Sequence, residues 1–195
     1  MEIGKVINKI LFYFLLIIHK HQFKHYGIKS KIDFITSYIV NKKLISIGDY
    51  VFIGPHVYIS ANLEIENYVM MGPKVTIIGG NHLFGQIGKR NRFLSATPES
   101  RGKIVIKEDA WIGCNVTILP DVVIGSGAII AAGSIVNKNI PPYCLAAGNP
   151  AKVKKLIFSN EELNEHLVKL KCSENEAEEI VKERKLYCEK NNISC

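Results

Sequence analysis

The stretch from Ile106 to Pro141 reads IKEDAW, IGCNVT, ILPDVV, IGSGAI, IAAGSI and VNKNIP, so it repeats every six residues. An earlier run from Ile35 to Thr76 has the same period: ITSYIV, NKKLIS, IGDYVF, IGPHVY, ISANLE, IENYVM and MGPKVT. The first position is aliphatic in twelve of the thirteen hexads, and Asn41 is the exception. A six-residue period is typical of a parallel β-helix, in which each hexad forms a short strand and a turn. We therefore predict a triangular prism of stacked coils, with the first residue of each hexad pointing inward.

The composition fits one globular domain of a cytoplasmic protein. At 195 residues and 47% hydrophobic content, the chain can bury a substantial core. Its formal charge of +7 favours an anionic ligand or surface, and the absence of RGG, zinc-finger or aromatic-basic patterns argues against nucleic acid. The five cysteines show no CxxC spacing and no cleavable signal peptide precedes them, so we expect reduced thiols.

Residues 1–30 are expected to form a helix and a linker. The apolar run ILFYFLLII, residues 10–18, is far shorter than the ~20 residues that a membrane-spanning helix needs. One interpretation is a helix that packs on the β-helix or on a neighbouring subunit. The residues expected to make that contact are Leu11, Phe14, Leu15 and Ile18. The other interpretation is a basic interfacial segment, residues 10–24, that touches the inner face of a membrane peripherally.

Residues 79–103 interrupt the β-helical domain that we expect over residues 31–150. Ile77 and Ile106 lie 29 residues apart, which is not a multiple of six, so this segment must leave the coil. It contains the basic sequence KRNR and several apolar residues. Non-periodic loops of this length inside compact domains are usually functional or disordered, and we favour function.

The tail, residues 151–195, is expected to continue as two helices. Capping-box spacing occurs at Ser159 with Glu162, and again at Ser173 with Glu176. The first helix is predicted to present one apolar face, and the second to run from residue 175 to residue 190. The residues of that first apolar face are Leu163, Leu167 and Leu170. Both helices are interpreted as packing or trimer-supporting elements.

One of the six histidines, His82, lies where catalysis is expected, at the start of the long loop after the sequence GGN. An unperturbed imidazole has a pKa near 6.5, which suits a general base at neutral pH. An ordinary surface histidine is the alternative. His56 lies at a hexad corner and is interpreted as structural or solvated.

The second run and its continuation, KIVIKEDAWIGCNVTILPDVVIGSGAIIAAGSIVNKNIPPYCLAAGNPAKVKK, together with the preceding dipeptide NH, resemble the hexapeptide-repeat acetyltransferases. The likeness is to xenobiotic (streptogramin and chloramphenicol) acetyltransferases and to maltose, galactoside and surface-polysaccharide O-acetyltransferases. It covers about residues 45–157. It implies a left-handed parallel β-helix, which is an exception to the right-handed crossover rule. It also implies a homotrimer that holds acetyl-CoA between neighbouring β-helices and requires no metal.

The same resemblance assigns roles to individual residues. His82 corresponds to the family's catalytic histidine, and Asn81 to a neighbour that we assign to acceptor binding. The positions that correspond to CoA contacts are Trp111, Cys114, Ala132, Gly133, Asn137, Lys138, Lys152 and Lys155. Four of these depart from the family's commoner residues or replace its arginine, namely Cys114, Asn137, Lys152 and Lys155. The alternatives are that Trp111 packs against the next subunit and that the lysines belong to a solvated basic tail.

The implied chemistry is direct acetyl transfer to a hydroxyl. A thioester is already activated, so the protein must align the acceptor, remove its proton and stabilise the oxyanion. His82 would supply the base, and a backbone N–H lining the groove the oxyanion donor. A Cys114 nucleophile is disfavoured because no histidine–acid pattern in the sequence would activate it.

The acceptor stays open at this level. The leading hypothesis is a sugar hydroxyl during synthesis of a surface polysaccharide or lipid-linked glycan. A xenobiotic acceptor and an amino-sugar or nucleotide-sugar N-acetyltransferase follow. A γ-carbonic-anhydrase-like zinc enzyme would need three imidazoles, whereas the β-helical region contains only His56 and His82. A non-catalytic solenoid would need flat threonine arrays and no long loop.

Overall fold

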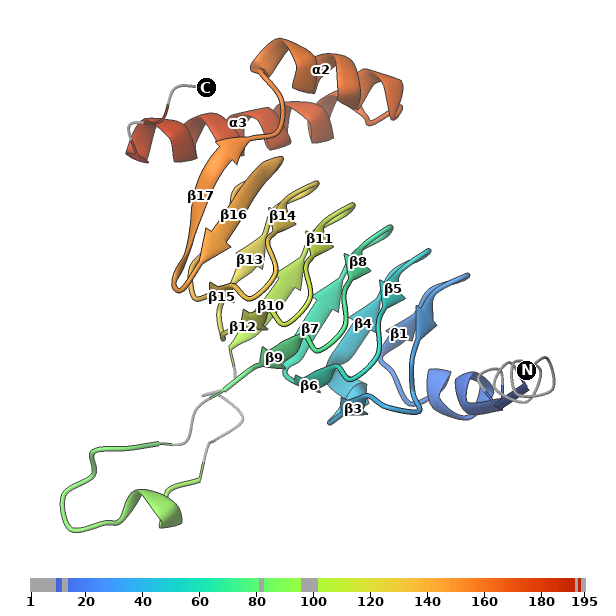
Figure 1. Ribbon diagram of the computed structural model, residues 1–195, viewed down its shortest axis with the longest axis vertical. Helices are drawn as coiled ribbons and strands as arrows, with labels where there is room; N and C mark the ends of the chain where they lie inside the picture. The colour runs from blue at the N-terminus through green and yellow to red at the C-terminus, as the bar shows by residue number, and fades with distance from the viewer. Residues whose placement is uncertain (1–9, 12–13, 81–82, 96–101, 192, 194–195) are drawn as a thin grey trace.

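The structure is a computed structural model that describes residues 10–11, 14–80, 83–95, 102–191 and 193. Its centre is a stack of coils with a short helix at the N-terminal end and two helices at the C-terminal end (Figure 1). The sequence-based prediction of a parallel β-helix is confirmed.

Three sheets form the walls of the prism. Wall one has the strand order β1-β4-β7-β10-β13, wall two β17-β16-β14-β11-β8-β5-β2, and wall three β15-β12-β9-β6-β3. Every pairing is parallel except that of β17 with β16. The strands of wall one are β1 (His25–Tyr26), β4 (Ile45–Ile47), β7 (Asn62–Ile65), β10 (Lys103–Ile106) and β13 (Val123–Ile124). Those of wall two are β2 (Lys31–Ile32), β5 (Phe52–Ile53), β8 (Met70–Met71), β11 (Trp111–Ile112), β14 (Ile129–Ile130), β16 (Cys144–Gly148) and β17 (Ala151–Leu156). Those of wall three are β3 (Tyr38–Ile39), β6 (Tyr58–Ser60), β9 (Thr76–Ile78), β12 (Thr117–Ile118) and β15 (Ile135–Val136).

The first residues of the hexads fill the prism from Ile47 onward. All eleven of them are at most 1% exposed. They are Ile47, Ile53, Ile59, Ile65, Met71, Ile106, Ile112, Ile118, Ile124, Ile130 and Val136. Burying this many branched side chains in one contiguous core supplies the main driving force for folding.

The first coil does not keep the period, and the prediction for Ile35 is wrong. Ile35 is 52% exposed, and the residue stacked beneath Ile53 is Ile32, twenty-one residues earlier instead of eighteen. Beneath Ile59 lies Ile39, twenty residues earlier. Asn41 has a left-handed backbone (φ 54°) and precedes a 3-10 turn at Lys42–Leu44, which absorbs residues between walls three and one. The exceptional hexad is therefore a longer corner.

The corners of the later coils share one backbone conformation. The fourth residue of successive hexads has a positive φ, for example 59° at Asp109, 57° at Asn115 and 60° at Asp121. Asparagine and aspartate tolerate this left-handed region better than most side chains. His56 occupies an equivalent corner with φ 59°, which supports its structural interpretation.

Two helices, α2 (Asn160–Lys169) and α3 (Glu174–Asn191), lie across the C-terminal end (Figure 1). Ser159 caps α2 with the predicted capping box. Leu163 and Leu167 are fully buried with Tyr143 in a second apolar cluster, but Leu170 is 52% exposed because it is the C-cap, where the helix ends.

Arg184 of α3 is buried and ties that helix to the start of α2. Its guanidinium donates from Nη1 to the Phe158 carbonyl (2.9 Å) and from Nη2 to the Asn160 side-chain oxygen. Further along α3, Cys188 is disulfide-bonded, which differs from the expectation that all the thiols are reduced. Cys114, Cys144 and Cys172 are free.

At the other end, residues 10–11 and 14–20 are helical, and Phe23 closes the first coil. The Phe23 ring is 8% exposed and packs against Tyr26 and Phe34. The helix before it does not cover a face of the prism within one chain, because Phe14 is 59% and Ile18 44% exposed. Within the described residues, every helix is too short or too polar to cross a bilayer.

Candidate functional site

The corner between walls two and three brings three of the predicted CoA-contacting residues together. The Gly133 N–H donates to the Cys114 carbonyl (2.9 Å), so these two residues stack in successive coils, and Ala132 lies beside them. All three are exposed. Gly113 keeps the layers close, because a Cβ there would lie 2.7 Å from the Ala132 nitrogen. The corner thus offers a side-chain-poor surface on which an extended amide-containing ligand could lie against the backbone.

Trp111 and Lys155 lie in one row across the outer surface of wall two. The register places Trp111 beside Ile129, Ile129 beside Leu145, and Leu145 beside Lys155. Trp111 is 49% exposed, and the row combines an aromatic surface with a cation three strands away.

Lys152 and Lys155 are held by a hairpin that the sequence reasoning missed, since it placed residue 151 at the start of a tail. β17 pairs antiparallel with β16, with Lys152 opposite Ala147. The Gly148 N–H donates to the buried Ser134 hydroxyl (3.1 Å), which fixes the hairpin near the corner of Gly133. The Asn-Pro dipeptide at residues 149–150 is the turn signal that could have revealed it.

Asn137 and Lys138 lie at a different corner of the prism. They follow β15 and lead from wall three toward wall one. A single chain therefore groups Trp111 and the residues at 114, 132, 133, 152 and 155 around wall two, but leaves these two apart.

His82 and Asn81 lie outside the described residues. The loop leaves the coil at Gly79, whose N–H donates to the Ser60 carbonyl (2.7 Å) and whose Cβ position would fall 2.4 Å from the Ala61 Cα. Only glycine permits this close exit. The described part of the loop contains the 3-10 turn Asn91–Phe93 and extends away from the prism (Figure 1).

The surface of this loop is apolar and basic. Phe84 and Phe93 are each 77% exposed and Ile87 is fully exposed, while the cations Lys89, Arg90 and Arg92 are also exposed. Such a surface is suited to contact with another molecule.

Two other features do not form a catalytic site. The Cys144 thiol is buried and burial raises its pKa to about 12, so it stays protonated and unreactive at neutral pH. Among the described residues, no three histidine, cysteine, aspartate or glutamate side chains gather as a metal site.

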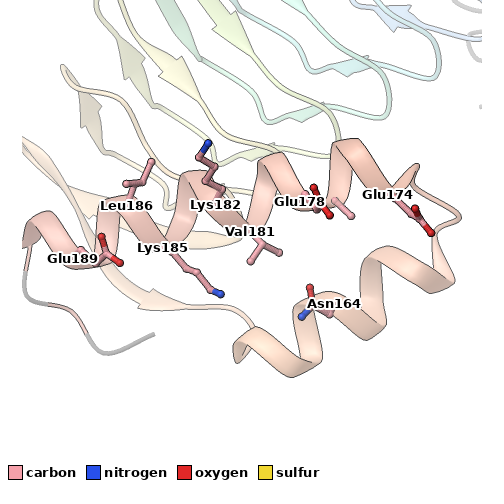
Figure 2. Close-up of a pocket in the computed structure, with 9 residues that line it drawn as sticks. Asn164, Glu174, Glu178, Val181, Lys182, Lys185, Leu186 and Glu189 are labelled. Atoms are coloured by element: carbon pink, nitrogen blue, oxygen red, sulfur yellow. The ribbon is translucent and has the colours of Figure 1, made fainter.

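A groove of about 650 Å³ lies between α2 and α3 (Figure 2). Asn164 of α2 lies across this groove from Val181 and Lys185 of α3. The lining contains neither histidine nor cysteine, and none of the predicted site residues lies in it.

Comparison with known proteins identifies the class. The family described as "Bacterial transferase hexapeptide (six repeats)" matches residues 103–138. A Staphylococcus aureus (strain COL) protein with the name "Putative acetyltransferase" is 36% identical over 157 residues, covering 73% of this chain and 70% of that protein. A Lysinibacillus sphaericus protein named as a probable macrolide acetyltransferase is 51% identical over 80 residues, which span 41% of this chain and less than half (44%) of that protein.

Two solved structures share the fold. A Vibrio cholerae hexapeptide-repeat acetyltransferase in complex with acetyl-CoA has a TM-score of 0.64 and 30% identity, covering 72% of this chain and 75% of that one. A maltose O-acetyltransferase from Clostridium difficile 630 has a TM-score of 0.65 and 28% identity, covering 73% and 74%.

The chain belongs to the hexapeptide-repeat acetyltransferases, whose fold is the left-handed parallel β-helix. It is therefore an acyltransferase, and the expected donor, acetyl-CoA, is the molecule bound in the Vibrio relative.

Proposed function

We propose that this protein transfers acetyl from acetyl-CoA to a hydroxyl of a sugar or surface-polysaccharide precursor, with His82 as the general base. The observation that carries the proposal is the exposed corner at Cys114, Ala132 and Gly133, bordered by Trp111 and by lysines on β17. The solved maltose O-acetyltransferase supports a sugar as the acceptor class.

The proposed reaction needs no covalent enzyme intermediate. His82 removes the proton of the acceptor hydroxyl as its oxygen attacks the thioester carbonyl carbon. A backbone N–H stabilises the resulting oxyanion, the C–S bond then breaks, and CoA leaves as the thiol after it takes up the proton from His82. Asn81 is proposed to orient the acceptor.

The lysines are assigned to the phosphates of CoA. Lys152 and Lys155 are exposed at the C-terminal end of wall two, beyond the corner that would hold the pantetheine arm. Lysine ammonium groups act on phosphate as compact point charges.

A homotrimer would bring together the proposed CoA contacts that lie at different corners of one chain. Lys138 and Asn137 lie around a different corner, so they can reach the same groove only from a neighbouring subunit. A row of apolar side chains on wall two supports such an interface, and we call Phe52, Met70, Trp111 and Ile129 the outer row. The first three are each about half exposed in the single chain. The loop that carries His82 would meet the next subunit.

The test is thiol release from acetyl-CoA by wild type and the variant His82→Ala. Loss of a positioned general base lowers turnover by roughly 10²–10⁴-fold, while CoA affinity, measured by calorimetry, stays unchanged. His56→Ala is the matched control, since that exposed histidine occupies a structural corner. Turnover of His82→Ala close to that of wild type would refute the assignment.

A xenobiotic acceptor is the second candidate, and the match to the protein named as a probable macrolide acetyltransferase favours it. The same assay, run against simple sugars, nucleotide sugars, macrolides, streptogramins and chloramphenicol, separates the two. A preference for a drug over every sugar would replace the leading proposal.

A further inference from the structure

The N-terminal helix (residues 10–11 and 14–20) presents an apolar stripe away from the protein. Ile10, Phe14 and Ile17 are 65%, 59% and 60% exposed. Leu11 and Ile18 are 39% and 44% exposed. The spacing of positions 10, 14, 17 and 18 places these side chains on one helical face. A helix on a globular protein normally buries such a face against the core, and here it faces outward.

The opposite face of the helix attaches it to the first coil. Leu15 and Leu16 are half-buried, and the His19 ring packs on Phe34 at 5.0 Å between centroids. Lys42 Nζ lies 3.3 Å from His19 Nδ1 and donates to Gln22 Oε1 (3.1 Å). The outward direction of the stripe is therefore set by contacts on the inner face.

Exposed lysines lie at the end of this helix and on the coils beside it. The lysine collar, as we name it, consists of Lys20, Lys24, Lys29, Lys31 and Lys43, all exposed. The first 50 residues contain eight lysines and three acidic residues, so five of the seven net positive charges lie in a quarter of the chain.

The acidic residues described at this end are engaged locally. Asp33 accepts from the Ile35 N–H (2.9 Å), and Asp49 accepts from the Ile28 N–H (2.8 Å). The five lysines of the collar outnumber these two carboxylates, so the surface beside the apolar stripe is positive.

A groove of about 700 Å³ lies between the inner face of the helix and three lysines of the collar. Leu16 and Lys20 line it from the helix, and Lys29, Lys31 and Tyr50 from the first two coils. The Lys29 ammonium donates to the Tyr50 hydroxyl (3.0 Å), which holds that cation at the groove wall. Aliphatic and cationic linings side by side match the two parts of an anionic phospholipid, its acyl chain and its phosphate.

We propose that this end of the protein docks on an anionic phospholipid bilayer, with the helix lying in the interface and the lysine collar on the headgroups. One short apolar segment binds a membrane weakly, and a second, electrostatic contribution makes the binding stable. A second copy of the chain fits this surface less well, because self-association would bring two lysine collars together.

The experiment measures partition of the full-length protein onto sedimenting vesicles. Vesicles of phosphatidylglycerol and phosphatidylcholine in equal parts are compared with pure phosphatidylcholine. We expect at least tenfold stronger partition onto the anionic vesicles, and a decrease at high salt because exposed charge pairs are screened.

Two sets of variants separate the stripe from the collar. The double variant Phe14→Ser with Ile17→Ser should lower partition at least tenfold. The control, Val168→Ser with Leu170→Ser, changes two residues at the opposite end that are 75% and 52% exposed, and it should not lower partition. The triple variant with Gln at positions 20, 24 and 43 in place of Lys20, Lys24 and Lys43 should lower partition about 100-fold. Each lysine near an anionic surface contributes about fivefold to membrane binding. Lys171, Lys182 and Lys185 changed to Gln are the matched control.

Equal binding to neutral vesicles, no binding to either, or unchanged partition of Phe14→Ser with Ile17→Ser would each overturn the proposal. A lower molar mass of that variant by light scattering would also overturn it, because the helix would then be covered by a second copy. Turnover of a soluble acceptor by the same variant tests the proposed function separately.

Discussion

The replacement Met70→Glu tests the proposed subunit interface at the centre of the outer row. Met70 lies directly between Phe52 and Trp111 in the register and is 50% exposed in the single chain. Full burial of a methionine is worth about 1.5–3 kcal/mol, so covering its remaining half contributes about 1 kcal/mol per subunit. Truncation to alanine then costs about 3 kcal/mol per trimer, or roughly 100-fold in association.

Glutamate costs more, because each buried carboxylate without a partner carries a desolvation penalty of several kcal/mol. We therefore expect no trimer of Met70→Glu at micromolar concentration. The folded subunit should persist, because the side chain points out of the prism.

Light scattering measures the mass, and circular dichroism checks the fold. Trp111 is the chain's only tryptophan, so its emission should shift to longer wavelength when the outer row becomes solvated. Leu170→Glu, at a site 52% exposed on the far helix, is the control. A trimeric Met70→Glu protein with unchanged emission would show that another surface forms the interface.

Three further predictions concern the lysines assigned to CoA, a carboxyl group of the β-helix and the core. Replacing Lys138, Lys152 and Lys155 together by alanine should raise the KM for acetyl-CoA more than it lowers kcat, because the phosphates are remote from the reacting carbonyl; a collapse of kcat at constant KM would contradict this role. Burial raises the pKa of Glu108, and repulsion from Glu176, Glu66 and Asp109 raises it further. The folded state therefore binds this proton more tightly than the unfolded state does. Stability is accordingly lost as pH rises from the ordinary glutamate range through the folded pKa. Glu108→Gln should accordingly raise Tm at pH 7 and have no effect well below pH 4.5, and thermal melts across that range would check it. Ile112→Ala, at a fully buried site, should lower the free energy of unfolding in urea by about 2–5 kcal/mol. The same change at the fully exposed Ile87 of the loop should lower it by under about 0.5 kcal/mol.

The β-helix could be predicted wherever the period is strict, because every strand of the prism needs one inward aliphatic residue and these residues recur every six positions. Ile112 and Ile130 obey it and stack directly on one another. Ile35 does not, because the longer corner at Asn41 and one extra residue between β2 and β3 place it in a corner instead of a strand. The left-handed backbone at Asn41 follows from local geometry that the hydrophobic pattern does not encode. Leu170 is similar: its helical spacing is right, but the helix ends there.

The proximity of Cys114 and Gly133 follows from the six-residue period, because the two residues lie about one coil apart. Their contact with CoA stays a prediction. The placement of Lys152 and Lys155 depends on an antiparallel hairpin whose pairing partner contains no hexad. The separation of Lys138 from these lysines depends on which wall each strand joins, and this requires counting corners through the whole second run. The role of His82 stays a prediction.

The stacking of β3, β6 and β9 fixes the distance between the first coil and the start of the loop. Neighbouring strands in a sheet are about 4.8 Å apart, and β9 immediately precedes Gly79, so the loop of residues 79–103 starts about 10 Å above the first coil. If that first coil rests on a bilayer, the number of coils before the loop sets the height at which an acceptor hydroxyl must stand. Inserting one eighteen-residue coil before the loop would raise this height by one strand spacing without changing a residue of the site, and would discriminate against acceptors that are tethered too close to the lipid surface.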